Sequence, residues 1–395
     1  MAGRNQGPLS GVRILDLTAV LMGPYTTQIF ADLGADVIKI EGPTGDTTRG
    51  LPPMIAPGQG GMFLNVNRGK RSLMLDLKQP AARGAVLRLA KTADIFIHSM
   101  RGAAIARLGL DYAALAGVNA KIIYANLYGF GRGGPYSDYP AYDDIVQGAS
   151  GLAAMQSRLT GGDPGYVASA VADKVAGLTG AYAVMAALFD RERSGMGQEI
   201  EVPMFETMVS FVMAEHLCGA ITVPPSGPPE YPRVIAPDRK PYRTKDGFIG
   251  LMIYNDKQWR AFFDLIGNPD WSRDPMFATM TSRTDNIGAV LGRLGDVIAS
   301  RTSAEWMTVF ADAEIPAMPI LSTEDLLSDP HLAATSFWHR AESGLGPVQM
   351  PGIPTRFSET PGAIGDPGPA LGADSEGILR EAGFSGSEIA SLLVC

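Results

Sequence analysis

The stretch VRILDLTAVLMGPYTTQIFADLGADVIKIE (residues 12–41) decides the fold that we expect for this chain. Two short apolar runs, 12–17 and 36–41, flank a helical segment that begins near Pro24 and is ended by Gly34. Proline near a helix start and glycine just past its end are the usual punctuation of a helix. A strand, a helix and a strand in this order predict a parallel strand pair covered by a helix.

The same alternation continues along the chain, with further strands expected at 72–77, 94–99 and 121–129. We therefore predict an α/β protein whose large domain is a Rossmann-like parallel sheet, with ligands bound beyond the carboxyl ends of the strands. The first strand-to-helix turn reads TAVLMGP (residues 18–24). It lacks the G-x-G-x-x-G spacing of a dinucleotide site, which argues against a nicotinamide or flavin oxidoreductase.

Tracts rich in proline and glycine suggest how the chain is divided. We expect residues 1–220 to form the large domain, 221–241 to be a linker, and 242–335 to form a smaller α+β domain that starts with a hairpin. A second Pro/Gly-rich linker is expected at 345–372, and the chain from about 340–395 should return to complete the large domain.

Composition narrows the class of protein. Only two cysteines and four scattered histidines occur, so neither a disulfide framework nor a metal site is expected. The N-terminus lacks an apolar signal core, and the most apolar long run, 167–189, is interrupted by Asp173 and Lys174. We therefore expect a cytoplasmic protein with no membrane span.

The net charge of −8 is unevenly distributed. Residues 1–110 contain 13 Lys and Arg against 7 Asp and Glu, a balance of +6, so the remainder carries −14. A basic N-terminal region in an acidic protein indicates a small anionic ligand more than a nucleic acid. The densest cations are Arg68, Lys70, Arg71 and Lys78, and a solvated surface turn is the alternative reading for each of them.

A long helix is predicted after Ala172 and ends at Gly195, with Asp173 at its start. One face of this helix is apolar and carries Val175, Leu178, Thr179, Tyr182, Met185, Ala186 and Phe189. Residues 166–172 contain no acid, so we expect the helix dipole and free backbone N–H groups to hold the Asp173 carboxylate ionised. From the spacing alone, Asp173 is either a reactive carboxylate or an ordinary N-cap.

Several stretches, in order along nearly the whole chain, closely resemble the family III CoA-transferases, also called the CaiB/BaiF family, to which formyl-CoA transferase and carnitine CoA-transferase belong. They are LSGVRILDLTAVLMGPYTTQIFADLGADVIKIEGPTGDTTRG (9–50), NVNRGKRSLMLDLKQPAARG (65–84), ADIFIHSMRGAAIARLGL (93–110), PAYDDIVQGASGL (140–152) and residues 173–206.

The resemblance implies a site and an assembly. Asp173 would be the catalytic nucleophile, and it could cap its helix as well. The implied CoA contacts are Val20, Leu21, Met22, Lys39, Leu75, Lys78, Ser99, Met100, Arg107, Tyr142 and Asp143. CoA would be a substrate rather than a tightly bound cofactor, and the partners would be an acyl-CoA, a small carboxylic acid and a second copy of the chain in an interlocked dimer.

The implied reaction moves CoA from an acyl-CoA thioester to a free acid through an aspartyl anhydride and an aspartyl-CoA thioester. Backbone N–H groups beside Asp173 or in the 129–134 glycine loop are candidate oxyanion donors. Two alternatives stay open, a 2-methylacyl-CoA racemase of the same family and a non-catalytic CoA-binding protein. The racemases use a histidine in a Gly-His-Asp sequence, where this chain has Ala141-Tyr142-Asp143, and this favours the transferase.

Overall fold

The computed structural model describes residues 7–393 and divides them into two compact units. The first unit comprises residues 7–150, 169–211 and 330–393, and the second comprises 151–168 and 212–329. This division differs from the predicted one, in which residues 1–220 formed a single stretch of the large domain. The segment 151–168 belongs to the second unit because its helix packs against a helix near residue 232.

The first unit is built on one six-stranded parallel sheet. Its order is β3-β2-β1-β4-β5-β6, which is the arrangement of a Rossmann-like fold. Every neighbouring pair is parallel, and β1 is central, with Ile14 opposite Val37 on one side and Ile95 on the other. The strands are β1 (Arg13–Leu17), β2 (Asp36–Glu41), β3 (Arg71–Met74), β4 (Ile95–His98), β5 (Ile123–Tyr128) and β6 (Glu199–Pro203). The predicted fold class is confirmed.

Helices cover both faces of this sheet, which is why its central strands are continuous apolar runs. On one face a core that includes Leu15, Phe96, Leu89 and Leu379 is packed by α3 (Pro80–Ala90), α5 (Tyr112–Val118), α17 (Ser375–Glu381) and α18 (Gly386–Leu393). The other face is covered by α1 (Met22–Asp32) and α8 (Val171–Ser194). The remaining helices of this unit are α2 (Gly61–Val66), α4 (Gly102–Arg107), α6 (Asp143–Ala149), α16 (Pro330–Ala334) and the first part of α9 (Met204–His216), whose residues from Val212 onward belong to the second unit.

The helix α8 buries its small residues together with Val184 and Leu188, and leaves several of its large apolar residues exposed. A Cβ atom on Gly177 would lie 2.8 Å from the Met22 carbonyl oxygen, and one on Gly180 would lie 3.1 Å from Thr26 Oγ1, so glycine is what permits the close packing on α1. On the predicted apolar face, Tyr182 and Phe189 are 63% and 67% exposed. The length and hydropathy of α8 would also allow a membrane span, but core helices of soluble proteins meet the same criteria.

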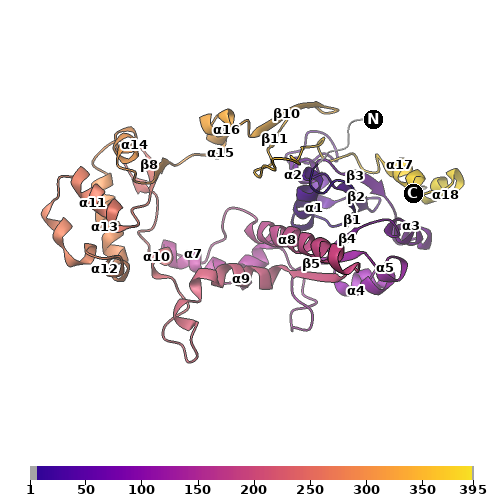
Figure 1. Ribbon diagram of the computed structural model, residues 1–395, viewed down its shortest axis with the longest axis horizontal. Coiled ribbons are helices and arrows are strands. Elements are labelled where there is room, and N and C mark those ends of the chain that lie inside the picture. The colour runs from indigo at the N-terminus through magenta and orange to yellow at the C-terminus, as the bar shows by residue number, and fades with distance from the viewer. Residues whose placement is uncertain (1–6, 394–395) are drawn as a thin grey trace. The chain divides into compact units, whose positions relative to one another are not determined.

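The C-terminal part of the chain packs against the beginning of the sheet. A hairpin of β10 (Trp338–Ser343) and β11 (Gly346–Pro351) comes first. The Gly69 N–H then donates to the Asp366 carbonyl at 2.8 Å, and the Ser72 N–H donates to the Asp374 carboxylate at 2.8 Å. Figure 1 shows this segment in yellow beside the indigo strands β2 and β3. The stretch 345–372, predicted to be a linker, is instead held by hydrogen bonds at several points: besides the bond to Asp366, Arg68 Nη1 donates to the Pro351 carbonyl at 2.6 Å and the Gly372 N–H donates to Ser72 Oγ at 2.9 Å.

The second unit is a small α+β domain, as predicted. Its three-stranded antiparallel sheet begins with the expected hairpin, and its core includes Trp259, Phe262, Trp306 and Phe310. The predicted linker 221–241 contains a short helix and contributes Ala236 to this core. The elements are α7 (Leu152–Thr160), α10 (Pro232–Ile235), β7 (Tyr242–Arg243), β8 (Phe248–Leu251), α11 (Asp256–Leu265), α12 (Met280–Asp285), α13 (Ile287–Ile298), α14 (Ser303–Asp312), β9 (Ala317–Pro319) and α15 (Thr323–Leu326).

Candidate active site

The carboxyl edge of the parallel sheet gathers most of the predicted CoA contacts. Val20 and Leu21 lie in the loop between β1 and α1, Met22 is the first residue of α1, and Ser99 and Met100 follow β4 directly. A hydrogen bond ties the two segments together, because the Ala19 N–H donates to Ser99 Oγ at 3.1 Å. The next turn is fixed by the Met100 N–H, which donates to His98 Nδ1 at 3.1 Å.

The start of α8 packs at the same edge. Thr26 Oγ1 in α1 donates to the Gly177 carbonyl at 2.8 Å, and Gly177 faces the carbonyl of Met22. Asp173 lies one helical turn before this contact. The first turns of α1 and α8 are therefore packed together, which brings the predicted nucleophile and the predicted CoA-binding loop to one region of the first unit.

The environment of Asp173 differs from the one predicted. Asp173 is the third residue of α8, whose N-cap is Ala170, and no side chain of the N-cap residue caps the helix. Burial, and after it the negative charge of Asp143, raises the pKa of Asp173 from 3.8 to about 6, although Lys174 opposes the change. The residues next to Asp173 in the sequence include no acid, but the fold brings Asp143 of α6 beside it. The prediction of an N-cap is wrong, and burial and Asp143 outweigh the stabilisation expected from the helix dipole.

Lys39 is not placed at the surface where a phosphate could reach it. Its ammonium is fully buried and donates to the Thr18 carbonyl and to Asp46 Oδ2, both at 3.0 Å. Asp46 also accepts hydrogen bonds from the Val20 N–H, at 3.2 Å, and from Thr48. Val20 has a left-handed φ of 71°, which is unfavourable for a β-branched residue. Lys39 therefore supports the loop that carries Val20, and its ammonium is not available to a phosphate of CoA.

Most of the cation cluster that follows α2 is also used inside the fold. Arg68 forms a bidentate ion pair with Asp32, at 3.0 and 2.7 Å, and is 2% exposed. Lys70 is paired with Asp16 at 3.2 Å, and burial lowers the pKa of Lys70 to about 8. Arg71 lies between Asp36 and Glu381. The positive balance of residues 1–110 therefore overstates the charge that is available to a ligand.

The remaining predicted contacts fall into three groups. Lys78, Arg107 and Tyr142 are exposed, and no ion pair of either cation is found within residues 7–393. Leu75 is fully buried in the core below α3, so its side chain is not available at the surface. Asp143 has both carboxylate oxygens engaged, one by the Asp173 N–H at 3.0 Å and the other by Gln147 at 2.6 Å.

The candidate oxyanion donors are also engaged. The Asp173 N–H is bound to Asp143, as described, and the Gly131 N–H of the glycine loop donates to the Glu206 carboxylate at 3.0 and 3.2 Å. A Cβ atom on Gly131 would lie 2.6 Å from Glu206 Oε1, so the Glu206 side chain would have to shift to admit one. Neither of these two N–H groups is free to bind an oxyanion in this conformation.

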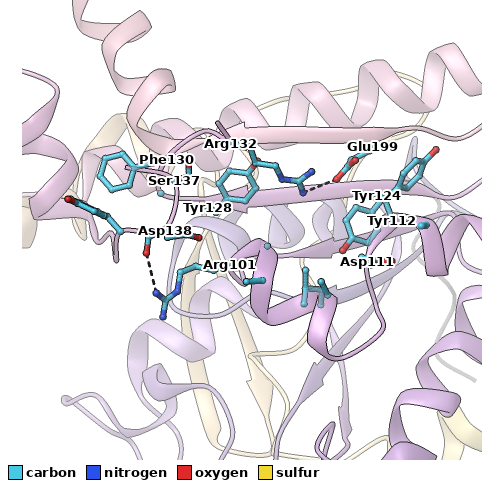
Figure 2. Close-up of a pocket in the computed structure, with 17 residues that line it drawn as sticks. Arg101, Asp111, Tyr112, Tyr124, Tyr128, Phe130, Arg132, Ser137, Asp138 and Glu199 are labelled. Carbon is cyan, nitrogen blue, oxygen red and sulfur yellow. Dashed lines mark hydrogen bonds and ion pairs between the residues drawn. The ribbon is translucent and has the colours of Figure 1, made fainter. Parts of the chain in front are cut away.

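A cavity of about 520 Å³ lies elsewhere in the first unit, between α4, α5 and the end of β5. Figure 2 shows its wall of Tyr112, Tyr124 and Tyr128, and above them Arg132 pairing with Glu199 at 2.9 Å. Neither Asp173 nor any predicted CoA contact lines this cavity. Within residues 7–393, no group of three or more His, Cys, Asp or Glu residues is arranged to hold a metal ion.

Reasoning from the sequence missed Gln147. Its side chain is 1% exposed and links α6 to the start of α8. The signal was present in PAYDDIVQGASGL, because Gln147 follows Asp143 by four residues and the two side chains share one face of a helix.

Comparison with known proteins agrees with this fold. The sequence profile of CoA-transferase family III matches residues 9–375. Succinate–glutarate CoA-transferase of Agrobacterium fabrum is 34% identical over 386 residues, which cover 95% of each chain. Acetyl-CoA:oxalate CoA-transferase of Acetobacter aceti is 34% identical over 373 residues, covering 91% of this chain and 92% of the relative.

Solved structures lead to the same family. The crystal structure of Rv3272 from Mycobacterium tuberculosis superposes with a TM-score of 0.82 at 30% identity, covering 94% of this chain and 99% of the other. A CaiB/BaiF family protein from Brucella suis gives a TM-score of 0.79 at 29% identity, covering 95% of this chain and all of the other. The chain therefore belongs to CoA-transferase family III, and the resemblance noted in its sequence is confirmed.

Proposed function

We propose that this protein moves CoA from an acyl-CoA thioester to a free carboxylic acid, with Asp173 as the covalent nucleophile. The observation that carries the proposal is the packing of the α8 start against the first turn of α1, which directly follows Val20 and Leu21, with a partly buried carboxylate one turn away. A carboxylate whose pKa is about 6 is ionised near neutral pH and is more basic than a solvated one. Greater basicity and lost hydration both favour attack on a thioester.

Four displacements complete the proposed reaction. An Asp173 oxygen attacks the thioester carbonyl and the C–S bond breaks. This step forms an acyl-aspartyl anhydride and releases the CoA thiolate. The thiolate then attacks the aspartyl carbonyl, which releases the donor acid and leaves an aspartyl-CoA thioester. The acceptor carboxylate displaces CoA to form a second anhydride, and the thiolate attacks the acceptor carbonyl. The products are a new acyl-CoA and the Asp173 carboxylate, with no net change in protons.

The substrates that we propose are short dicarboxylic acids and their CoA thioesters. Relatives of this chain are named for succinate and glutarate, for oxalate, and for mesaconate. A screen of CoA thioesters against these acids, with mass detection of new thioesters, identifies the donor and the acceptor. Exposed Lys78 and Arg107 are the cations that we propose for the CoA phosphates, since each is free to form charge-assisted hydrogen bonds.

We also propose that the protein is a homodimer. The supporting observation is the exposed apolar face of α8, where Leu178, Tyr182 and Phe189 are each at least half exposed. Large apolar side chains that gather on one helix face commonly mark an interface between proteins. Sedimentation of the Phe189→Glu variant tests the proposal, and a parent protein that sediments as a monomer at micromolar concentration would refute it.

Trapping of the intermediate tests the reaction. Hydroxylamine added with acyl-CoA, in the absence of an acceptor acid, should convert Asp173 to a hydroxamate, and the peptide mass should reveal it. A racemase would instead carry solvent deuterium to the α-carbon of a 2-methylacyl-CoA and leave Asp173 unmodified. A non-catalytic CoA-binding protein would do neither. Deuterium uptake with unmodified Asp173, or no change in either assay, would overturn the proposal.

A further inference from the structure

The beginning of α8 is held by a side chain from another helix. Its own N-cap residue, Ala170, has no side-chain oxygen that could accept a hydrogen bond from the first turn. Asp143, the first residue of α6, takes this role, because its Oδ1 accepts the Asp173 backbone N–H at 3.0 Å. The backbone of the proposed nucleophile is therefore fixed by a neighbouring carboxylate.

Asp143 is in turn fixed by Gln147, one turn further along α6. Gln147 Nε2 donates to Asp143 Oδ2 at 2.6 Å and to the Ser169 carbonyl at 3.2 Å. Ser169 lies four residues before Asp173, in the segment that leads into α8. One buried amide group thus ties Asp143 and this segment together.

The chemistry of the two contacts selects glutamine at position 147. Both partners are acceptors, so the residue needs two N–H donors without a charge of its own, and the amide of glutamine supplies them. Glutamate would place a second negative charge beside Asp143 and could not donate to the Ser169 carbonyl. Leucine would leave one oxygen of a partly buried carboxylate without a donor, which costs free energy.

We propose that Gln147 is a positioning residue for the transfer reaction, acting through Asp143 on the backbone of Asp173. This inference rests on the proposed role of Asp173 as nucleophile. Without Gln147, Asp143 is free to rotate, the start of α8 loosens, and the Asp173 carboxylate loses its alignment toward the thioester. Misplacement of a reacting group by about 1 Å costs as much as a hundredfold in rate. We expect the loss of Gln147 to leave the binding of CoA to the loop of Val20 and Leu21 unchanged.

The environment of Asp173 also provides a readout that a purely structural role would not change. Burial is the largest cause of the raised pKa of Asp173. Of the two charged groups that also act on it, Asp143 from α6 raises the pKa and Lys174 from α8 itself lowers it. The ammonium of Lys174 is held by Ser169 Oγ, and α1 contributes Tyr25 near Gly177. When Asp143 is free to move away, its repulsion weakens, so the acid limb of the rate profile should move to lower pH.

Gln147→Leu is the test, and Gln28→Leu is its matched control. Gln28 is also buried and donates to an aspartate four residues further on, Asp32, at 3.0 Å, but this pair does not contact Asp173. We expect Gln147→Leu to lower kcat by roughly tenfold to a hundredfold with a nearly unchanged KM for acyl-CoA. Its acid limb should shift to lower pH. Gln28→Leu should match it in thermal stability and retain the parent kcat and profile.

The outcomes separate this inference from the proposed function. If the parent enzyme traps hydroxylamine on Asp173 and Gln147→Leu keeps the parent kcat and acid limb, the positioning role is wrong and the nucleophile stands. If the parent shows no trapping on Asp173, the proposed function itself fails. Should Gln147→Leu not fold, Gln147→Glu serves instead, with the same expected loss of kcat and a parent-like KM. A parent-like kcat in Gln147→Glu would equally overturn the inference.

Discussion

Replacement of Asp173 by asparagine should make the protein more stable, although it should abolish transfer. The carboxyl group of Asp173 has a pKa raised from 3.8 to about 6, first by burial and then by repulsion from Asp143. Its ionisation therefore costs free energy in the folded state that it does not cost in the unfolded chain. Asparagine has nearly the same shape and carries no charge. The variant removes this cost while it keeps the side chain in place.

The magnitude and the sign follow from linkage. An acid whose pKa is raised on folding has no effect on stability at a pH below the pKa that it has in the unfolded chain. Its ionisation then destabilises the fold as the pH rises toward and beyond the pKa that it has in the folded state. A change from 3.8 to about 6 is worth about 3 kcal/mol when ionisation is complete. We therefore expect Asp173→Asn to gain up to about 3 kcal/mol near pH 7.5 and roughly half of this near pH 5.

Urea unfolding of parent and variant at these two pH values measures the difference. Asp144→Asn is the control, because Asp144 is an exposed neighbour on α6 and its replacement should leave the free energy of unfolding unchanged within about 0.5 kcal/mol. A variant that is less stable than its parent near neutral pH would refute the reasoning. So would a gain that is the same at both pH values, because only a titrating group gives the pH dependence.

Four further substitutions test the support of the site. Val20→Gly should raise the free energy of unfolding by about 1 kcal/mol, as measured by urea unfolding. Relief of the strained left-handed valine, about 1–3 kcal/mol, exceeds the cost of the added backbone entropy, about 0.5–1 kcal/mol. The more flexible loop should raise the KM for acyl-CoA, as measured from initial rates. Lys39→Met should cost about 3–5 kcal/mol in urea unfolding, because Asp46 is left buried without its counter-ion. Lys78→Ala should instead retain stability within about 0.5 kcal/mol and raise that KM. Gly177→Val should lower the free energy of unfolding by about 1–3 kcal/mol, measured by thermal unfolding, because its Cβ atom would lie 2.8 Å from a main-chain oxygen of α1.

Local patterns were sufficient to predict five of the six strands of the sheet. Residues 12–41 form β1, α1 and β2 because their apolar runs and the glycine at position 34 act within a few residues of each other. The strand β6 was not predicted, since Glu199 and Glu201 alternate with apolar residues at a partly exposed edge of the sheet. Residues 143–160 form two helices, α6 and α7, because Gly151 adopts a left-handed φ of 85° between them.

The electrostatics of the site depended on pairs that the sequence does not display. Counting the charges of residues 1–110 treated Lys39, Arg68 and Lys70 as available cations. Each of them is buried against an aspartate from a different element of the same region. The acids were part of the same count, but a count of charges contains no information about which of them meet in the fold. Lys78 and Arg107 have no ion-pair partner within residues 7–393, and they are cations for which the charge argument still applies.

Asp173 shows how magnitudes decide between two correct principles. A carboxylate in the first turn of a helix is stabilised by the dipole, typically by about 0.3–1 kcal/mol. Burial together with the charge of Asp143 works in the opposite direction and is worth about 3 kcal/mol, so the pKa rises. The same comparison explains why a cap was the wrong reading. A capping carboxylate is stabilised by the N–H groups it accepts, whereas Asp173 leaves its own N–H to Asp143 and keeps a destabilised carboxylate. Such a carboxylate gains most from bonding to an acyl carbon, because that bond removes its charge.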